Sequence, residues 1–589
     1  MKNGMLKRYA NFLIQYLRPL KRQVALLAIL IFATIGLQLV NPQIIRYFID
    51  TAMTAGTEGA QTTHLIWAAL IFIAAALLLQ GISVAATYVG EDIGWRATNH
   101  LRNDLALHCL SLDMTFHNNH TPGEMIERID GDIVEIAVFF AQFILRVLGN
   151  VLLLLGVIVV LLWEDWRISG ALAIYTVISL ISFYYMRRIA IPFWEANRQA
   201  AADLFSFLEE HLSGTEDIRA SGAVNYVMRN LFKFSKARLD REVKGGDMEI
   251  WFVGMWFVLY TLGQLVAFSA GYWQFSQGLI TVGTVYLIVY YTDRILQPLN
   301  EITNQFQNIQ KAAAGINRVE ALYALTSKIQ DQGEAKLHNG PLAVGFDDVT
   351  FGYVATEPVL RNVSFELPRK QILGVLGRTG SGKTTLTRLL YRLYDPTDGS
   401  ICLRSSEHID IRQIKVEELR GRIGMVTQDV QLFRATVREN LTFFNPEISD
   451  ARILAVIDEL ELREWVDRLP NGLDTELQAE GSSLSAGEAQ LLAFTRVFLQ
   501  DPGLVILDEA SSRLDPATER LIERAVDKLL QNRTGIIVAH RLSTVQRADH
   551  ILILQDGAIQ EYGVREQLAN DPSSRFYALL QTGLEEVLV

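Results

Sequence analysis

Apolar segments long enough to cross a bilayer occur only in the first half of the chain, before about residue 300. A helix needs about 20 apolar residues to cross roughly 30 Å of hydrocarbon. The pattern predicts six membrane-spanning helices, at Gln23–Val40, His64–Val89, Phe139–Trp163, Ile168–Met186, Ile250–Trp273 and Leu279–Leu296. An even number of crossings places both ends of this region on the same side of the membrane.

The distribution of Lys and Arg orients these spans. Asp50–Thr63 and Gln274–Gly278 contain neither residue, whereas the N-terminus and the long segments Glu91–Ala137 and Arg187–Glu249 contain many. Because cytoplasmic loops carry the excess of basic residues, the termini and the two long segments are predicted to be cytoplasmic. The long segments have helical spacing with few Pro or Gly residues, so we expect the spanning helices to continue into the cytoplasm.

The opening stretch Met1–Arg22 mixes basic residues with aromatic and Leu positions. No small-residue cleavage site follows the first apolar run, so the stretch is predicted to be an interfacial helix and not a signal peptide.

After the apolar segments the chain changes character. Thr326–Gly340 is polar, and beyond it the apolar runs QILGVLG, LVILDE and GIIVAH alternate with helical segments such as Lys383–Tyr394. Strands that alternate with helices predict a mostly parallel, doubly wound α/β sheet. We therefore expect an α-helical membrane domain at 1–325, a linker at 326–340 and an α/β domain at 341–589.

The composition agrees with a membrane part joined to a soluble part, since the 589 residues are 50% hydrophobic and yet 20% charged. The formal net charge of −11 argues against nucleic-acid binding, which needs a basic surface. Cys109 and Cys402 are far apart in sequence, so neither a disulfide framework nor a thiolate metal site is predicted.

The strongest motif for chemistry is GRTGSGKT, which directly follows the run QILGVL. It fits the P-loop pattern, in which glycines let backbone N–H groups approach phosphate oxygens at the start of a helix. Lys383 would place a cation near the β and γ phosphates, and the Thr384 hydroxyl would bind Mg²⁺. The alternative is a Gly-rich turn without a ligand. The residues predicted to hold ATP are Gly377, Arg378, Thr379, Gly380, Ser381, Gly382, Lys383, Thr384 and Thr385.

The run LVILDE at Leu504–Glu509 ends in two acids. Asp508 is placed to hold the water shell of Mg²⁺, and Glu509 is placed to orient and deprotonate the attacking water. Two acids after a strand are also compatible with the start of a loop, but the P-loop upstream favours the catalytic interpretation.

The second half resembles the P-loop NTPase cassette of ABC transporters, because further motifs of that family follow in the family's order. They are FGYVATEPVL with Tyr353, MVTQDVQLF with Gln428, LSAGEAQ with Ser485, Ala486, Gly487 and Glu488, SSRLD with Asp515, and IVAHRLST with His540. The resemblance implies that Tyr353 stacks on adenine, Gln428 contacts the metal and senses the coupling helices, and His540 hydrogen-bonds to the γ phosphate. It also implies that the LSAGE signature completes the nucleotide site of an opposite cassette and that Asp515 belongs to the D-loop.

The cytoplasmic loops resemble those of ABC exporters with the six-helix, domain-swapped transmembrane fold. Phe116–Asp132 resembles the first coupling segment, and Ser206–Gly222 resembles the approach to the second coupling helix. The alternative is a charged helix surface with a turn at Thr121–Gly123.

The signature departs from the family's usual LSGGQ with a basic residue after it, since this chain has LSAGE and then Ala489. Ala486 adds a methyl group and Glu488 adds a negative charge, so both are expected to weaken the site that this signature closes. Glu509 and His540 match the family. The mismatch favours pairing with a different ABC half over a homodimer, with one efficient and one degenerate ATP site.

The resemblance implies ATP-driven transport by alternating access in a bacterial inner membrane. Export is favoured because a cassette fused after six spans is the exporter arrangement. An importer of the same arrangement and an ATP-gated channel or regulatory membrane protein remain as alternatives. A soluble ABC ATPase is excluded if the six spans insert.

The cargo is left open as an amphipathic drug, a lipid or a peptide. Aromatic residues in the last two spans would suit such a substrate, although aromatic side chains that face lipid or neighbouring helices are commoner. These residues are Trp251, Trp256, Tyr260, Phe268, Tyr286, Tyr290 and Tyr291. Asp293 and Arg294, near the cytoplasmic end of the sixth predicted span, are better indicators of where the cargo binds. Charges at such positions usually face a cavity or each other.

Overall fold

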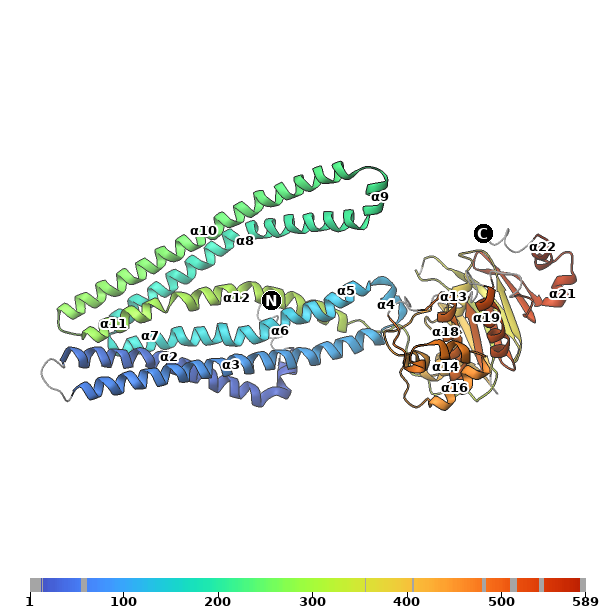
Figure 1. Ribbon diagram of the computed structural model, residues 1–589, viewed down its shortest axis with the longest axis horizontal. Coiled ribbons are helices and arrows are strands. Elements are labelled where there is room, and N and C mark those ends of the chain that lie inside the picture. Colours follow the sequence, from blue (N-terminus) through green and yellow to red (C-terminus); the bar gives the residue numbers. More distant parts are fainter. Residues whose placement is uncertain are drawn as a thin grey trace. The chain divides into compact units, whose positions relative to one another are not determined.

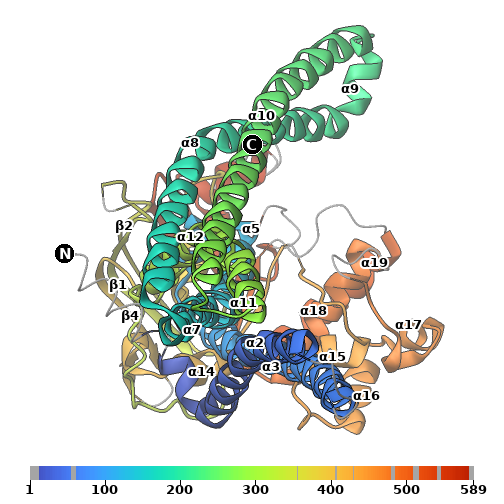
Figure 2. The ribbon, with the colours of Figure 1, turned by 90° about the vertical axis from the view of Figure 1, so that its left-hand side faces the viewer.

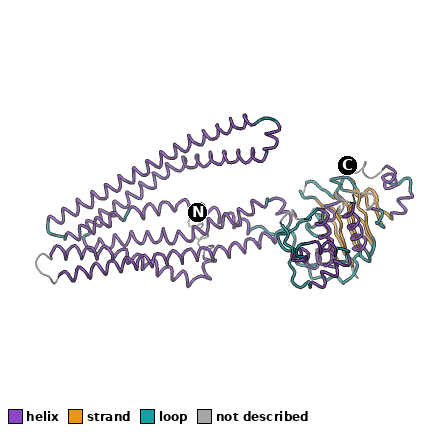
Figure 3. Tube along the Cα trace, in the orientation of Figure 1, coloured by secondary structure: helices purple, strands orange, loops and turns teal. Residues whose placement is uncertain are grey.

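The computed structural model describes residues 12, 14–54, 61–354, 356–404, 407–428, 430–478, 484–508, 516–539 and 545–582. The chain forms two compact units, one of Met1–Leu110 with Pro122–Leu325 and one of Ser111–Thr121 with Thr326–Val589. Glu509, Asp515 and His540 lie outside the described residues. In Figure 3 helices build the described part of the first unit, and the strands belong to the second.

The first unit is a bundle of long helices (Figure 1). Its main helices are α2 (Lys21–Thr54), α3 (Gln61–Ser111), α7 (Gly149–Glu164), α8 (Trp166–Ser213), α10 (Val224–Ser276), α11 (Val282–Asp293) and α12 (Leu296–Tyr323). Shorter pieces are η1 (Arg18–Leu20), α5 (Pro122–Ile126), η2 (Glu127–Gly131), α6 (Asp132–Gln142), η3 (Phe143–Leu148) and α9 (Thr215–Ala220). With 51, 48 and 53 residues, α3, α8 and α10 are more than twice as long as a bilayer requires,. The predicted helical continuation of the spans is confirmed.

Five of the described helices are long and apolar enough to cross a membrane: Ile14–Met53, Thr62–Ser111, Arg146–Glu164, Trp166–Ser213 and Val224–Ser276. Each overlaps one of the first five predicted spans. The extent of the sixth prediction, Leu279–Leu296, is wrong, because α11 ends at Asp293 after 12 residues and α12 begins at Leu296. Pro298 accounts for the break, since its ring has no N–H and clashes with the carbonyl of Arg294 four residues earlier.

The helices α8 and α10 lie side by side in both views of the ribbon (Figures 1 and 2). Inside the bundle, the Tyr175 hydroxyl of α8 donates to the Leu259 carbonyl of α10 at 2.9 Å. A Cβ atom at Gly263 would lie 2.5 Å from that hydroxyl oxygen. The glycine therefore lets the tyrosine ring reach the backbone of the neighbouring helix.

The second unit contains two sheets. The antiparallel sheet has the order β2 (Leu360–Leu367), β1 (Ala343–Phe351), β4 (Asp398–Arg404), β5 (His408–Asp410). The larger sheet has the order β10 (Ala558–Val564), β9 (His550–Gln555), β3 (Ile372–Leu376), β8 (Thr534–Val538), β7 (Leu504–Asp508), β6 (Ile423–Val426), and is parallel except for β10. The predicted apolar runs are β3, β7 and β8, and nearly all of their residues are buried, as is usual for parallel strands covered on both faces,.

Short helices complete the second unit. They are α4 (Met114–Asn119), α13 (Lys383–Leu390), η4 (Ile411–Gln413), α14 (Val416–Arg422), α15 (Val437–Thr442), α16 (Asp450–Glu459), α17 (Arg463–Arg468), η5 (Gly472–Asp474), α18 (Ala486–Gln500), α19 (Pro516–Leu530), α21 (Arg565–Asn570) and α22 (Arg575–Thr582).

The segment 326–340 packs against this unit through a buried arginine. Arg392 is only 1% exposed. Its guanidinium donates to the carbonyl of Gln330 at 3.1 Å and to those of Ile411 and Ile414 at 3.2 and 2.9 Å, and it pairs with Asp395 at 3.0 Å. One side chain thus satisfies three backbone carbonyls from two separate segments.

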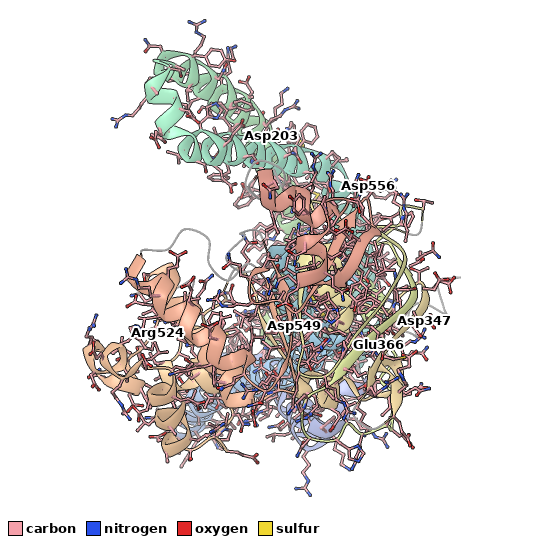
Figure 4. The ribbon with its side chains drawn as sticks, turned by 90° about the vertical axis from the view of Figure 1, so that its right-hand side faces the viewer. Asp203, Asp347, Glu366, Arg524, Asp549 and Asp556 are labelled. Atoms are coloured by element: carbon pink, nitrogen blue, oxygen red, sulfur yellow. The ribbon has the colours of Figure 1, made fainter. Side chains whose placement is uncertain are left out.

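Replacing Arg392 by Met is expected to lower stability by about 3–5 kcal/mol, because Asp395 and three carbonyls lose their partner. For a domain of this size the melting temperature should fall by roughly 10 °C, measured by thermal unfolding of the purified full chain in detergent. Arg404→Met is the control, because its pair with Glu366 of β2, labelled in Figure 4, is exposed and 3.4 Å long, and exposed pairs contribute less than about 1 kcal/mol. Equal shifts for both variants would contradict the role given to Arg392.

Candidate nucleotide-binding site

The loop between β3 and α13 forms an open cradle of backbone. Gly377, Gly380 and Gly382 have φ values of 151°, 82° and 104°, a region that residues with a Cβ rarely adopt. A Cβ atom at Gly377 would lie 2.4 Å from the Leu554 carbonyl oxygen, and one at Gly382 would lie 2.5 Å from a Leu360 methyl carbon. Glycine is therefore required at these two positions by the conformation of the loop that leads into α13.

Two buried polar side chains belong to this loop. Lys383 is 5% exposed, and its Nζ donates to the carbonyls of Gly377 and Arg378 at 2.6 and 3.0 Å. Ser381 is 4% exposed, and its Oγ has no hydrogen-bond partner. A buried hydroxyl without a partner is unusual in proteins. A phosphate oxygen would provide that partner and would also attract the ammonium group, so the loop fits a nucleotide phosphate.

Tyr353 lies beside the start of α13. Its hydroxyl is 3.2 Å from Thr385 Oγ1 and accepts a hydrogen bond from Arg388 at 3.3 Å. The ring packs edge-on against Phe351 and Tyr394, and the residue remains 39% exposed. Part of the ring is thus open to a ligand, and stacking on adenine stays a prediction.

Three residues predicted to bind the metal line one cavity of about 1140 Å³: Thr384, Gln428 and Asp508. No group of three or more His, Cys, Asp or Glu side chains that could hold a metal occurs in the described part of the chain. Mg²⁺ is usually held by one or two carboxylates together with substrate phosphates and waters. One carboxylate with a hydroxyl and an amide nearby fits that ion.

Asp508 ends β7 and is opposite Val538 of β8 in the parallel register. Of the site residues predicted from the sequence, only Glu509, Asp515 and His540 have no described position, so their roles stay predictions.

Helix α4 contributes to the wall of the cavity that the predicted metal-binding residues also line. Met114 and Asn118 line it, and Asn118 Nδ2 donates to the Tyr394 hydroxyl at 2.6 Å. Asp113 caps the helix by accepting from the Thr115 N–H at 2.8 Å, and it also accepts from the Lys328 N–H at 2.5 Å. Burial works to raise the pKa of Asp113, but these hydrogen bonds outweigh it and hold the pKa below its usual value. The start of the segment that resembles a coupling segment is thus anchored at the cavity that Gln428 also lines.

Arg496 of α18 was not singled out from the sequence. Its guanidinium donates to the carbonyls of Gln431 and Asn440 at 3.1 and 2.7 Å and lies 4.5 Å from the ring centre of Phe443. Burial lowers its pKa to about 10, which still leaves it charged at neutral pH. Arg496 therefore ties the signature helix to the segment that follows Gln428.

The LSAGE signature begins α18, and its own residue Glu488 places a carboxylate at the start of that helix. Ser485 is the N-cap and accepts from the Glu488 N–H at 3.3 Å, while Glu488 Oε2 accepts from the Ser485 N–H at 2.7 Å. The second oxygen of Glu488 accepts from Trp465 Nε1 at 3.1 Å. This is a capping box, whose S-x-x-E pattern is readable at 485–488, whereas the contact with Trp465 has no sequence signal.

Two family models match the chain. One, for the ABC transporter transmembrane region, covers residues 24–299, and the other, for the ABC transporter cassette, covers residues 360–512. A fatty acid ABC transporter ATP-binding/permease protein of Mycobacterium tuberculosis is 30% identical over 88% of this chain and 80% of its own length. This chain belongs to the ABC transporters. The family and the function class inferred from the motifs are confirmed.

Two further relatives agree with the full-length architecture. An ATP-dependent lipid A-core flippase of Idiomarina loihiensis is 27% identical over 98% of both chains. The solved structure of a bacterial Atm1-family ABC exporter with ATP bound covers 96% of this chain and 99% of its own, with a TM-score of 0.79 and 24% identity, and this likeness supports the fold. The chain is an integral membrane protein and one half of an ATP-driven ABC exporter, with its membrane domain before its ATPase cassette.

Lys383→Ala is expected to weaken ATP binding about 10- to 100-fold, because a hydrogen bond to a charged group is worth roughly 1.5–3 kcal/mol. Binding of a fluorescent ATP analogue to the assembled transporter measures this change. The matched control is Lys415→Ala, an exposed lysine before α14 that does not line the cavity. Unchanged affinity in Lys383→Ala would count against this loop as the working site.

Proposed function

We propose that this chain pairs with a different ABC half and that the two ATP sites of the pair are unequal. Its own P-loop forms the efficient site, and its signature closes a degenerate site on the partner. The observation that carries this proposal is the bonding of Glu488, whose carboxylate already occupies the N-terminus of the signature helix.

The electrostatics of that helix support the proposal. A helix N-terminus attracts anions through its unpaired N–H groups and its dipole. In α18 one oxygen of the Glu488 carboxylate accepts from the N-cap N–H, and Trp465 donates to its other oxygen. A nucleotide phosphate brought to this helix would meet a negative charge in place of an amide. A homodimer would have this arrangement at both of its sites.

The chain's own P-loop has no such obstacle among its described residues. Lys383 and the N–H groups of the glycine loop would hold the phosphates, and Thr384, Gln428 and Asp508 would hold Mg²⁺, which supplies neutralising charge at the phosphate oxygens. Glu509 would take a proton from the attacking water, and His540 would hydrogen-bond to the γ phosphate. These two roles rest on the match to the family's motifs.

Coupling to the membrane domain would use two contacts. Helix α4 packs in the cavity beside Gln428, and the rest of that cavity offers room for a second short helix. We assign this room to α9 of the partner subunit, in keeping with the domain-swapped exporters that the loops resemble. The first turn of α9 carries Glu216 and Asp217, and Arg388 and Arg496 line the cavity, so the charges are complementary.

The substrate proposed for this exporter is an amphipathic, lipid-like molecule. Two full-length relatives are named for fatty acids and for lipid A-core. Alternating access would follow from closure of the two cassettes on ATP and their reopening after hydrolysis.

Glu509→Gln in the assembled pair is expected to reduce ATP hydrolysis at least about 100-fold while leaving ATP binding nearly intact, because it removes the base and not the phosphate cradle. Ser485→Ala should have a much smaller effect, because it alters only the degenerate site. Steady-state ATPase assays compare the two variants with the chain expressed alone and with its genomic neighbour. A homodimer that loses activity equally to both changes would overturn the unequal-site proposal.

Glu488→Gln is expected to tighten nucleotide binding at the partner's site about two- to fivefold, since a charge near a helix terminus is worth roughly 0.3–1 kcal/mol. The readout is trapping of labelled ATP on the partner chain. Glu464→Gln is the control, because this exposed carboxylate of α17 lies next to Trp465 in sequence but does not bond to it or to α18. Weaker binding in Glu488→Gln would show that the carboxylate assists the site.

A further inference from the structure

A cavity of about 240 Å³ lies inside the first unit at the break between α11 and α12. Residues of α2, α3, α7, α11 and α12 line it, and Figure 1 shows α11 and α12 meeting in this unit. Leu39, Leu79, Leu153 and Val157 contribute apolar wall, and Tyr290 and Tyr291 contribute aromatic rings. A cavity among spanning helices that is partly apolar and partly polar suits an amphipathic molecule.

Two charged residues line this cavity, Arg294 and Glu301, and only Glu301 has an ion-pair partner among the described residues. Glu301 is paired with Arg146 at 3.3 Å. Arg294 is exposed and lies 5.3 Å from the ring centre of Tyr290, and no described carboxylate lies within ion-pairing distance of it. Its neighbour Asp293 is exposed and does not line the cavity. An unpaired charge within a spanning region is costly unless it serves a ligand or a water-filled space.

Asn41 of α2 provides a second, independent indication of a ligand. It lines the same cavity and is only 8% exposed, yet its Oδ1 has no hydrogen-bond partner. Leaving such a group unsatisfied costs about 1–3 kcal/mol. Beside Arg294, its carboxamide offers a polar contact for a headgroup that carries hydroxyl or amide groups next to an anion.

The size of the cavity limits what it holds. Sites that enclose a whole drug-sized molecule measure about 300–1,000 Å³, so 240 Å³ accommodates a headgroup and the first few methylene groups. The tail of an amphiphile would extend out of the cavity along the apolar surfaces of the spanning helices.

We propose that this cavity is the headgroup subsite for an anionic amphiphile, a carboxylate or phosphate joined to an apolar tail, with Arg294 as the anion ligand and Asn41 as the polar contact. The proposal rests on the proposed export of a lipid-like substrate and adds the charge of its headgroup. Its test needs no nucleotide, so its failure is separate from any failure of the ATP-site proposal.

The test measures binding of dodecyl phosphate to the assembled transporter in a neutral detergent without nucleotide, by isothermal titration calorimetry. Arg294→Gln is expected to weaken binding at least about tenfold, and Arg294→Lys, which keeps the charge, should stay within about threefold of the original. Asn41→Leu should weaken binding by an intermediate factor. Arg167→Gln is the matched control, because Arg167 also lies over aromatic rings, those of Trp166 and Trp273, but does not line the cavity.

Three further probes test whether the site requires both the negative charge and the apolar tail of its ligand. Dodecanol and dodecyltrimethylammonium should bind at least about tenfold more weakly than dodecyl phosphate, and inorganic phosphate should bind about 100-fold more weakly. Equal binding of the neutral or cationic probe would overturn the charge preference. Inorganic phosphate that binds as tightly as dodecyl phosphate would show a site for a free anion and overturn the amphiphile. Full binding by Arg294→Gln, or an equal loss in Arg167→Gln, would overturn the site itself.

Discussion

Backbone N–H and C=O groups have to be hydrogen-bonded wherever water is excluded, and both units of this chain are organised around that requirement. In the membrane domain it is met by helices that run without interruption for up to 53 residues. The exception is the sixth span, where Pro298 cannot continue the ladder and α11 gives way to α12,. The polar cavity with Arg294 and Asn41 lies at that exception, so the place where the constraint is broken is also where a ligand could be recognised.

In the cassette the same requirement concerns the ends of helices. The first N–H groups of a helix have no partner within it. At α13 three glycines with positive φ shape the loop that precedes the helix, and no side-chain cap is bonded there, whereas at α18 the side chains of Ser485 and Glu488 satisfy two N–H groups internally. One helix start is therefore prepared for a phosphate and the other already has its anion. This difference, within a single cassette, is the physical basis of the proposal that the two ATP sites are unequal.

Two arginines, the buried Arg392 and the half-buried Arg496, connect separate segments of the cassette. Arg392 bonds to the 326–340 segment and to the loop before α14, and Arg496 bonds the signature helix to the segment after Gln428. Each has several fixed donors and stays charged, so it can satisfy a set of carbonyls that an apolar side chain would leave unpaired. Arg496 and Asn118 of α4, which donates to Tyr394, both line the cavity that holds the predicted metal residues.

The sequence by itself determined what depends on local patterns. Apolar runs predicted six spans, five of which are helices long enough to cross a membrane, and the strands β3, β7 and β8. The glycine spacing at Gly377–Lys383 predicted the turn between a strand and a helix, because hydrophobic periodicity and backbone conformation are set by residues close together in the chain. The break at Pro298 was missed although its signal is local, because the apolar run continues through it.

Only the tertiary structure decided the contacts between distant residues. Trp465 donates a hydrogen bond to Glu488, which is 23 residues away in the sequence, and Asn118 donates one to Tyr394, which is 276 residues away. Asn41 and Arg294 line the same cavity although they are far apart in the sequence. No sequence motif predicts such contacts, because they depend on how whole helices pack. The sequence therefore specified that ATP is bound. The packing of helices decided that Glu488 is held at the start of α18 and that Arg294 lines a cavity of the membrane domain without an ion-pair partner among the described residues.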